Sequence, residues 1–360
     1  MKALFLIIIF CLFGEFVRAQ QLHPFKETYD QVLEPYYANT SYNDTTVRWW
    51  VGWGSILQSY INMYEATGDK AYLNRFIKHT YGIQLRKGTN EKWPAIDDDQ
   101  QFNYTGLLIR PMAEFIYIVK NDPNLYNTNL FPGIIPSVLS NPHQTILGYG
   151  DFANWLETRV VETVDYFNDE YWITSEFCYS PMPLSPSERN CADNNNCSSC
   201  NCPQSAAINF QVSWAISMLF LSSANPSSYY EYTTKAITLT NYFKSLISAY
   251  PGNESYTWWH NPAFREDVSH GGIDIQLPIV AHSVYNGFFD PYEMNRFAHT
   301  FTFNIWDRYN LTLHNNVFGT DIDCSDDQFL CSKQIPINGN VNYFGPGEIL
   351  TWMPMYKYDD

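Results

Sequence analysis

The chain has few basic residues. Its 360 residues include 21 Lys and Arg against 37 Asp and Glu, which gives a formal net charge of −16 at pH 7. Proteins that bind nucleic acid need a basic face to neutralise phosphates. The shortage of basic residues therefore argues against a nucleic-acid partner, and it also disfavours any polyanionic ligand unless a local basic patch exists.

Long apolar runs are absent after the first residues. Residues 1–19 contain the charged Lys2, an apolar run over 3–13 and the small-residue site Val17-Arg18-Ala19, which predicts a cleaved secretory signal. No later stretch reaches about 18 consecutive apolar residues, so we expect no membrane partner. No stretch has the composition of an interdomain linker, and residues 20–360 are expected to form one secreted, monomeric domain. Six glycosylation sequons fit this location, at Asn39, Asn43, Asn103, Asn196, Asn253 and Asn310.

Cysteines are few but clustered. Eight are present, and removal of the one in the signal leaves seven: Cys178, Cys191, Cys197, Cys200, Cys202, Cys324 and Cys331. The spacing of the cluster over 191–202 resembles a metal knuckle, but an oxidising compartment favours disulfides. We expect Cys324 to pair with Cys331, no metal site and no cofactor. The pairing of the other cysteines stays open.

Apolar residues recur at helical spacing along most of the chain. The pattern predicts helices over 47–66, 70–85, 105–120, 152–167, 210–222, 229–248, 272–287, 291–307 and 347–357. Gly68 should end the first helix, Asp69 should cap the second, and Pro278 should kink or shorten the helix over 272–287. Strand patterns are short, at 171–177 and 335–341. Long loops at 88–102, 122–150 and 182–206 are candidates for functional segments.

Helical hairpins recur, which indicates a repeated architecture. Asn74-Arg75-Phe76 is followed by His79-Thr80, and Asn295-Arg296-Phe297 is followed by His299-Thr300. Repeats at long spacing suggest a closed array. We predict an all-α fold, an (α/α) toroid built as an incomplete barrel of six or seven helical hairpins, with a cleft at one mouth. His79 and His299 are expected to pack between repeats.

The stretch 258–274 has the least core-like composition. Its 17 residues include two tryptophans, two histidines, an arginine, three carboxylates and paired glycines. Burying such groups unpaired would cost several kcal/mol each. Aromatic faces stack on sugar rings, histidine moves protons near neutral pH, and arginine grips carboxylates with two bonds. The stretch is therefore interpreted as one wall of a saccharide cleft.

The segment Glu266-Asp267-Val268-Ser269-His270, after Trp-Trp-His and before a helix, suggests a family. Trp49-Trp50 at the first hairpin and the Thr67-Gly68-Asp69 turn add to the likeness. Together these resemble (α/α)-toroid polysaccharide lyases of the alginate and glucuronan class, over about 49–359. The resemblance implies β-elimination beside a uronic acid in a polysaccharide.

The resemblance also implies site residues. His270 matches the signature histidine and is expected to be the base. Asn209 is expected to neutralise the uronate carboxylate, and Tyr343 to protonate the departing oxygen, with Tyr256 and Tyr285 as alternatives.

Further residues are expected to contact substrate. The expected contacts are Trp49, Trp53, Trp93, Arg110, Trp258, Trp259, His260, Arg265 and Glu266. Arg110 and Arg265, with Lys92 and Arg296, could supply the basic patch that an acidic polymer needs.

Two other functions remain open. A toroid glycosidase would use a carboxylate pair, drawn from Asp97-Asp98-Asp99 and from Glu266 or Asp267. The acidic net charge favours this alternative. A glycan-binding protein would have the aromatic cleft without working proton-transfer groups.

Overall fold

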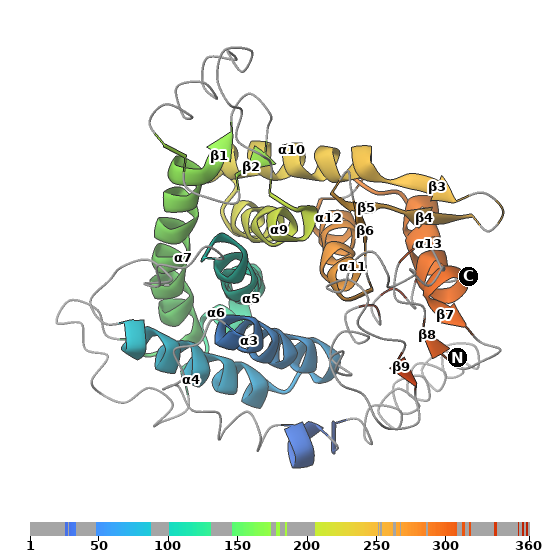
Figure 1. The fold of residues 1–360 in the computed structure, drawn as a ribbon. Coiled ribbons are helices and arrows are strands. Elements are labelled where there is room, and N and C mark those ends of the chain that lie inside the picture. Colours follow the sequence, from blue (N-terminus) through green and yellow to red (C-terminus); the bar gives the residue numbers. More distant parts are fainter. Residues whose placement is uncertain are drawn as a thin grey trace, which may run out of the picture.

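The structure is a computed structural model and is mostly helical (Figure 1). It describes residues 26–27, 29–33, 48–87, 101–130, 146–173, 178–180, 184–185, 206–250, 252, 254–261, 264–266, 268–285, 287–307, 312–313, 317, 335–336, 352, 355 and 358. Within this part of the chain, no helix combines the length and the apolar character needed to cross a membrane.

The helices carry most of the described residues. They are η1 (Tyr29–Leu33), α3 (Arg48–Thr67), α4 (Lys70–Lys87), α5 (Gln101–Asn121), α6 (Pro123–Tyr126), α7 (Tyr149–Tyr171), α9 (Ile208–Ala224), α10 (Tyr230–Leu246), α11 (Val268–Asp274), α12 (Gln276–Val284), α13 (Pro291–His299) and η3 (Thr300–Ile305).

The strands are two or three residues long and pair antiparallel. They are β1 (Trp172–Ile173) with β2 (Cys178–Tyr179), β3 (Ser248–Tyr250) with β4 (Ser255–Thr257), β5 (Trp259–Asn261) with β6 (Phe264–Arg265), and β7 (Trp306–Asp307) with β8 (Thr312–Leu313), which also pairs with β9 (Ile335–Pro336).

The helices form an inner and an outer row. Helices α3, α5, α9, α11 and α12 lie in the middle of the molecule, and α4, α7 and α10 cover them from outside (Figure 1). In the inner row, α3 packs on α5, α5 on α9, and α9 on both α11 and α12. Each outer helix packs on its inner partner in the pairs α3–α4, α5–α7 and α9–α10. The hairpin pattern predicted from the sequence is thus present in the described part.

Glycines let the inner helices approach closely. A Cβ on Gly54 would lie 2.6 Å from the Leu107 carbonyl oxygen, and one on Gly106 would lie 2.8 Å from Nε1 of Trp214. Pro111 lies inside α5 and has no N–H, so the Leu107 carbonyl lacks its usual helical donor and can face Gly54. The contacts between α3 and α5 and between α5 and α9 therefore depend on small residues.

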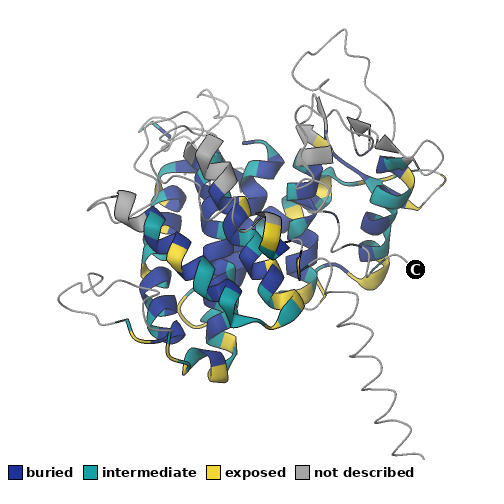
Figure 2. Cartoon of the chain, turned by 90° about the horizontal axis from the view of Figure 1, so that it is seen from below, coloured by how far each residue is buried: buried dark blue, intermediate teal, exposed yellow. Residues whose placement is uncertain are grey.

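Helix α9 is buried on every side over most of its length, from Gln211 to Ser222. Its apolar residues show no single stripe because neighbours cover it all round. The Phe102 ring at the start of α5 stacks on the Trp214 ring at 5.2 Å, and the indole of Trp214 donates to the Phe102 carbonyl at 3.1 Å. Figure 2 shows that buried residues line the contacts between the helices.

The turn between α3 and α4 is formed as the sequence predicts. Gly68 has a φ of +69°, a left-handed conformation that a side chain disfavours. Its N–H donates to the Tyr64 carbonyl and ends α3. The Asp69 carboxylate accepts from the Ala71 N–H at 2.9 Å and caps α4.

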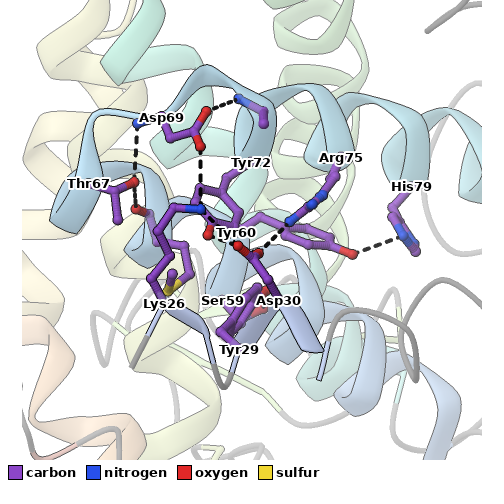
Figure 3. Close-up of polar contacts among 12 residues, drawn as sticks. Lys26, Tyr29, Asp30, Ser59, Tyr60, Thr67, Asp69, Tyr72, Arg75 and His79 are labelled. Carbon is purple, nitrogen blue, oxygen red and sulfur yellow. Dashed lines mark hydrogen bonds and ion pairs between the residues drawn. The ribbon is translucent and has the colours of Figure 1, made fainter. Parts of the chain in front are cut away.

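The N-terminal segment docks on this hairpin through a polar cluster (Figure 3). The Asp30 carboxylate accepts hydrogen bonds from Lys26, Tyr72 and Arg75 at 2.8 to 3.0 Å. Burial alone would raise the pKa of Asp30, but these three hydrogen bonds outweigh it and hold that pKa below its ordinary value. We name these four residues the Asp30 cluster.

Other sequence predictions differ from the structure. The helix expected over 272–287 is divided at Ile275 into α11 and α12, because Pro278 in the first turn of α12 cannot donate to a preceding carbonyl. The helix expected over 291–307 ends at His299 and continues as the wider turn of η3. Most of 335–341 and of the helix expected over 347–357 lies outside the described residues.

Candidate functional site

Trp258 and Trp259 have opposite environments. Trp258 is fully buried, its ring stacks on Trp352 at 6.2 Å, and its Nε1 donates to the Asp274 carboxylate at 2.9 Å. Trp259 follows in β5 and is exposed by 38%. Neighbouring side chains on a strand point to opposite faces, which explains the difference. The prediction that Trp258 contacts substrate is therefore wrong, and Trp259 keeps its role as a prediction.

Glu266 lies inside the fold and His270 at its surface. Glu266 is fully buried, its N–H donates to the Trp258 carbonyl, and its carbonyl accepts from the Val317 N–H. The His270 side chain is 36% exposed, and its Nδ1 lies 4.0 Å from the Glu266 carboxylate. A buried side chain cannot contact a polysaccharide, so the prediction that Glu266 binds substrate is wrong.

Close packing fixes the backbone beside His270. A Cβ on Gly271 would lie 2.9 Å from Cγ1 of Val317 and 3.1 Å from Cζ2 of Trp352. No residue larger than glycine fits there without a shift of its neighbours. Helix α11 therefore holds the imidazole on a rigid element, as catalytic geometry requires.

Asn209 is in the first turn of α9, which packs on α11. The side chain is 1% exposed, and its Oδ1 is buried without a hydrogen-bond partner among the described residues. Asn209 does not cap the helix, because Ala207 occupies the cap position of α9. A buried amide oxygen without a partner costs about 1–3 kcal/mol, a cost that a bound ligand or water would remove.

Arg110 lies at the middle of α5 and is partly exposed. Its Nε and Nη1 are nevertheless sealed from solvent and have no acceptor within the described part of the chain. Burial lowers the pKa of Arg110, and the nearby negative charge of Glu114 partly offsets this effect. An arginine in this condition has donors available for a carboxylate.

Glu114 lies one helical turn after Arg110 on the same side of α5. Its Oε2 accepts from Gln58 Nε2 on α3 at 2.7 Å. Burial and the nearby charge of Glu65 raise the pKa of Glu114 to about 7. Glu114 can therefore change its charge near neutral pH.

Trp53, another predicted contact, is a core residue. It is 1% exposed, and its ring lies 5.2 Å from the imidazole of His79 in the contact between α3 and α4. The prediction that Trp53 stacks on a sugar is wrong, because no face of its ring is accessible. His79 is buried and bonded to the Tyr60 hydroxyl at 3.1 Å, so it packs inside the first hairpin, whereas the sequence predicted packing between repeats.

Several predicted residues have only their backbone described. Trp49 lies in α3, His260 in β5 and Arg265 in β6, and their side chains lie outside the described part. Other predictions fall wholly outside it. These are Lys92, Trp93, Asp97, Asp98, Asp99, Asp267, Tyr343 and all the cysteines except Cys178.

Three residues considered for the site lie elsewhere in the fold. The Tyr285 hydroxyl donates to Thr233 of α10 at 3.1 Å. The Arg296 guanidinium on α13 lies over the Tyr256 ring at 4.9 Å and donates to the Glu254 carbonyl. Contacts within the fold therefore explain the positions of these three side chains, and no substrate is needed to explain them.

The sequence interpretation missed Glu114 and Asp274. Arg110 and Glu114 are oppositely charged residues four positions apart between apolar residues of one helix, a pattern that is visible in the sequence. Asp274 closes the 258–274 stretch and is fully buried under the Trp258 indole. Its burial could not be predicted without the position of Trp258.

Comparisons of the chain with protein-family models, with curated proteins and with solved structures found no match.

Proposed function

We propose that this protein is a secreted polysaccharide lyase that cleaves a uronic-acid polymer of the alginate or glucuronan type by β-elimination. The observation that carries the proposal is the partly exposed His270 imidazole on the rigid helix α11, 4.0 Å from the buried carboxylate of Glu266. An imidazole beside a buried carboxylate suits the removal of a proton near neutral pH.

The reaction needs three groups. His270 removes the proton from C5 of the uronate, and the electron pair of that C–H bond forms the C4=C5 double bond. The C4–O4 bond breaks, and the departing oxygen takes a proton from an acid, for which we propose Tyr343. The Glu266 carboxylate stabilises the imidazolium that forms at His270.

Asn209 supports the proposal through its position on α9. Proton removal from C5 becomes feasible only when the neighbouring C6 carboxylate is neutralised. The amide of Asn209 is buried on the helix that packs against α11, and its Oδ1 has no partner among the described residues. Because the side chain is 1% exposed, the start of α9 has to open locally before the amide N–H of Asn209 can donate to the uronate.

The fold and the composition agree with this role. We propose that the inner and outer rows of helices close into an (α/α) toroid, with the inner helices around the substrate. The segment over 1–19 and the sequons support secretion and glycosylation.

Incubation with alginate, glucuronan and glycosaminoglycans tests the function. Elimination creates a C4=C5 double bond conjugated to the carboxylate, so ultraviolet absorbance should rise together with new reducing ends. New reducing ends without absorbance would show a glycosidase. Neither signal, with retained affinity for the polymer, would show a glycan-binding protein. Either result overturns the proposal.

A carboxylate pair receives less support from the described residues. Glu266 and Asp274 are both fully buried, so neither can protonate a glycosidic oxygen without local opening. The remaining candidates, Asp97, Asp98, Asp99 and Asp267, lie outside the described part of the chain.

A further inference from the structure

Helix α5 is covered on three sides and partly exposed along the fourth. It packs on α3, α9 and α7. Five of its partly exposed residues recur at three- and four-residue spacing and so share one face. They are Asn103, Leu107, Arg110, Glu114 and Tyr117. We name this face the α5 stripe.

The α5 stripe faces the middle of the helix array. Phe115, on the opposite face of α5, packs on Phe152 of α7 at 5.7 Å. Gly106, beside the stripe, faces Trp214 of α9, and Glu114, within it, bonds to Gln58 of α3. The stripe therefore lies between α9 and α3, on the side away from α7.

We propose that Arg110 binds the carboxylate of an acidic sugar and that Glu114 controls this binding by competing for Arg110 when it is ionised. The choice of a uronate as the ligand rests on the proposed function. The binding of a carboxylate needs no turnover and can be tested separately.

Arg110 is available because Glu114 does not hold it. No ion pair within the described residues joins the two side chains, and Nε and Nη1 of Arg110 have no acceptor there. Leaving buried donors of a charged group unpaired is costly, at about 1–3 kcal/mol or more. A carboxylate matches the planar donor fork of an arginine better than a neutral sugar hydroxyl does.

A second polar group lies on the neighbouring helix. Ser213 of α9 is fully buried, and its Oγ has no hydrogen-bond partner among the described residues. Its Cβ lies 3.2 Å from the position of a Cβ on Gly106, one helical turn before Arg110. A hydroxyl at this place can supply a further hydrogen bond to an anion held by the arginine.

Glu114 can regulate ligand binding at Arg110 because it loses its proton within the physiological pH range. Burial and the charge of Glu65 raise its pKa to about 7, while the hydrogen bond from Gln58 and the charge of Arg110 act in the opposite direction. Below that pH Glu114 is neutral and Arg110 is free to bind an anion. Above it, the Glu114 carboxylate attracts the same guanidinium and repels the ligand.

The test is the affinity for D-glucuronate, a monosaccharide without a glycosidic bond to cleave. Titration calorimetry or ligand-observed NMR is done at about pH 5.5 and about pH 8.5, on either side of the pKa of Glu114. Wild type should bind about tenfold more weakly at the higher pH, because the binding-competent fraction falls. D-glucose, which has no carboxylate, should show no such change.

Three variants separate the roles. Arg110→Gln should lose glucuronate binding at both pH values. Glu114→Gln should keep the tighter affinity at both. Lys120→Gln is the control for Arg110→Gln, because it also removes one positive charge from α5. Lys120 pairs with Glu157 on α7, so this variant should bind glucuronate as wild type does. If Arg110→Gln does not fold, the pH profiles of wild type and Glu114→Gln decide the matter.

The proposal fails if Arg110→Gln binds glucuronate as wild type does. It also fails if Glu114→Gln keeps the wild-type pH dependence, or if wild type shows none. If the protein binds glucuronate in this manner but forms no double bond in any uronate polymer, the proposed carboxylate site is supported and the proposed lyase function is wrong. If the protein forms the double bond but does not bind glucuronate in this manner, the lyase function is supported and the proposed carboxylate site is wrong.

Discussion

The Asp30 cluster and the polar groups of α5 and α9 differ in whether they have partners. In the Asp30 cluster, the carboxylate accepts three hydrogen bonds, two of them from cations (Figure 3). On α5 and α9, Arg110, Asn209 and Ser213 each have a sealed polar atom without a partner in the described part of the chain. Paired groups hold a segment in place, whereas unpaired buried groups cost stability and are kept for a ligand.

The comparison predicts that the two regions respond to pH in opposite directions. Burial lowers the pKa of His79, beside the Asp30 cluster, to about 4. The unfolded chain gains a proton there below about pH 6.5, so folding loses stability as the pH falls from 6.5 to 4. Glu114 has a raised pKa, so its contribution is present below its ordinary pKa of 4.5 and is lost as the pH rises toward 7.

The largest stability effect is therefore expected at His79. His79→Leu should remove a pH-dependent contribution of about 3 kcal/mol, so the stability difference from wild type should shrink by that amount between pH 7 and pH 4. Chemical unfolding of both proteins across this range measures it. A constant difference would mean that His79 is protonated in the folded protein.

Glu114→Gln is the matched change in the inner region. It should gain stability relative to wild type as the pH rises from about 4.5 to about 7, because Glu114 ionises in the unfolded wild-type chain before it does so in the folded protein. Because the two contributions oppose each other in wild type, only the differences between variant and wild type isolate them. If the difference in unfolding free energy between Glu114→Gln and wild type does not depend on pH, Glu114 is not buried as described.

The substitution Asn209→Ala should change activity much more than stability. Asn209→Ala should reduce kcat/KM on a uronate polymer by about 100-fold, because it removes the donor that neutralises the substrate carboxylate. Its stability should change by less than about 1 kcal/mol, since the Oδ1 has no hydrogen bond to lose within the described residues.

Asp30→Ala is the control for that change. It removes a paired carboxylate that is 28% exposed, so it should lower stability by about 1 kcal/mol and leave turnover unchanged. Steady-state rates and thermal unfolding of both variants make the comparison. If Asn209→Ala loses stability and keeps activity, Asn209 has a structural role like that of Asp30 and does not act on the substrate.

The sequence predicted the helical hairpins well because their signals are local. Apolar spacing marks α3, α4, α5, α7 and α10, and Gly68 with Asp69 marks the first turn. Pro278 predicts a kink or a shorter helix over 272–287, but apolar spacing alone does not place the break at Ile275. The hairpins of β3 with β4 and of β5 with β6 are too short to show a period of two.

The site was harder to predict than the fold because residue type does not give burial. Trp258 and Trp259 are identical neighbours, yet one is buried under Trp352 and the other is exposed. Glu266 is likewise interior while His270, four residues on, reaches the surface. Tertiary packing decides which member of each pair can meet a ligand.

The most direct test is the rate of double-bond formation by His270→Ala on a uronate polymer that wild type cleaves. The proposed function predicts a loss of about 1000-fold, the contribution of a positioned general base, with thermal stability near that of wild type. His299→Ala, a partly buried histidine on α13, is the matched control and should keep its activity. Activity of His270→Ala within about threefold of wild type would contradict the assignment of the base, and with it the account of this site.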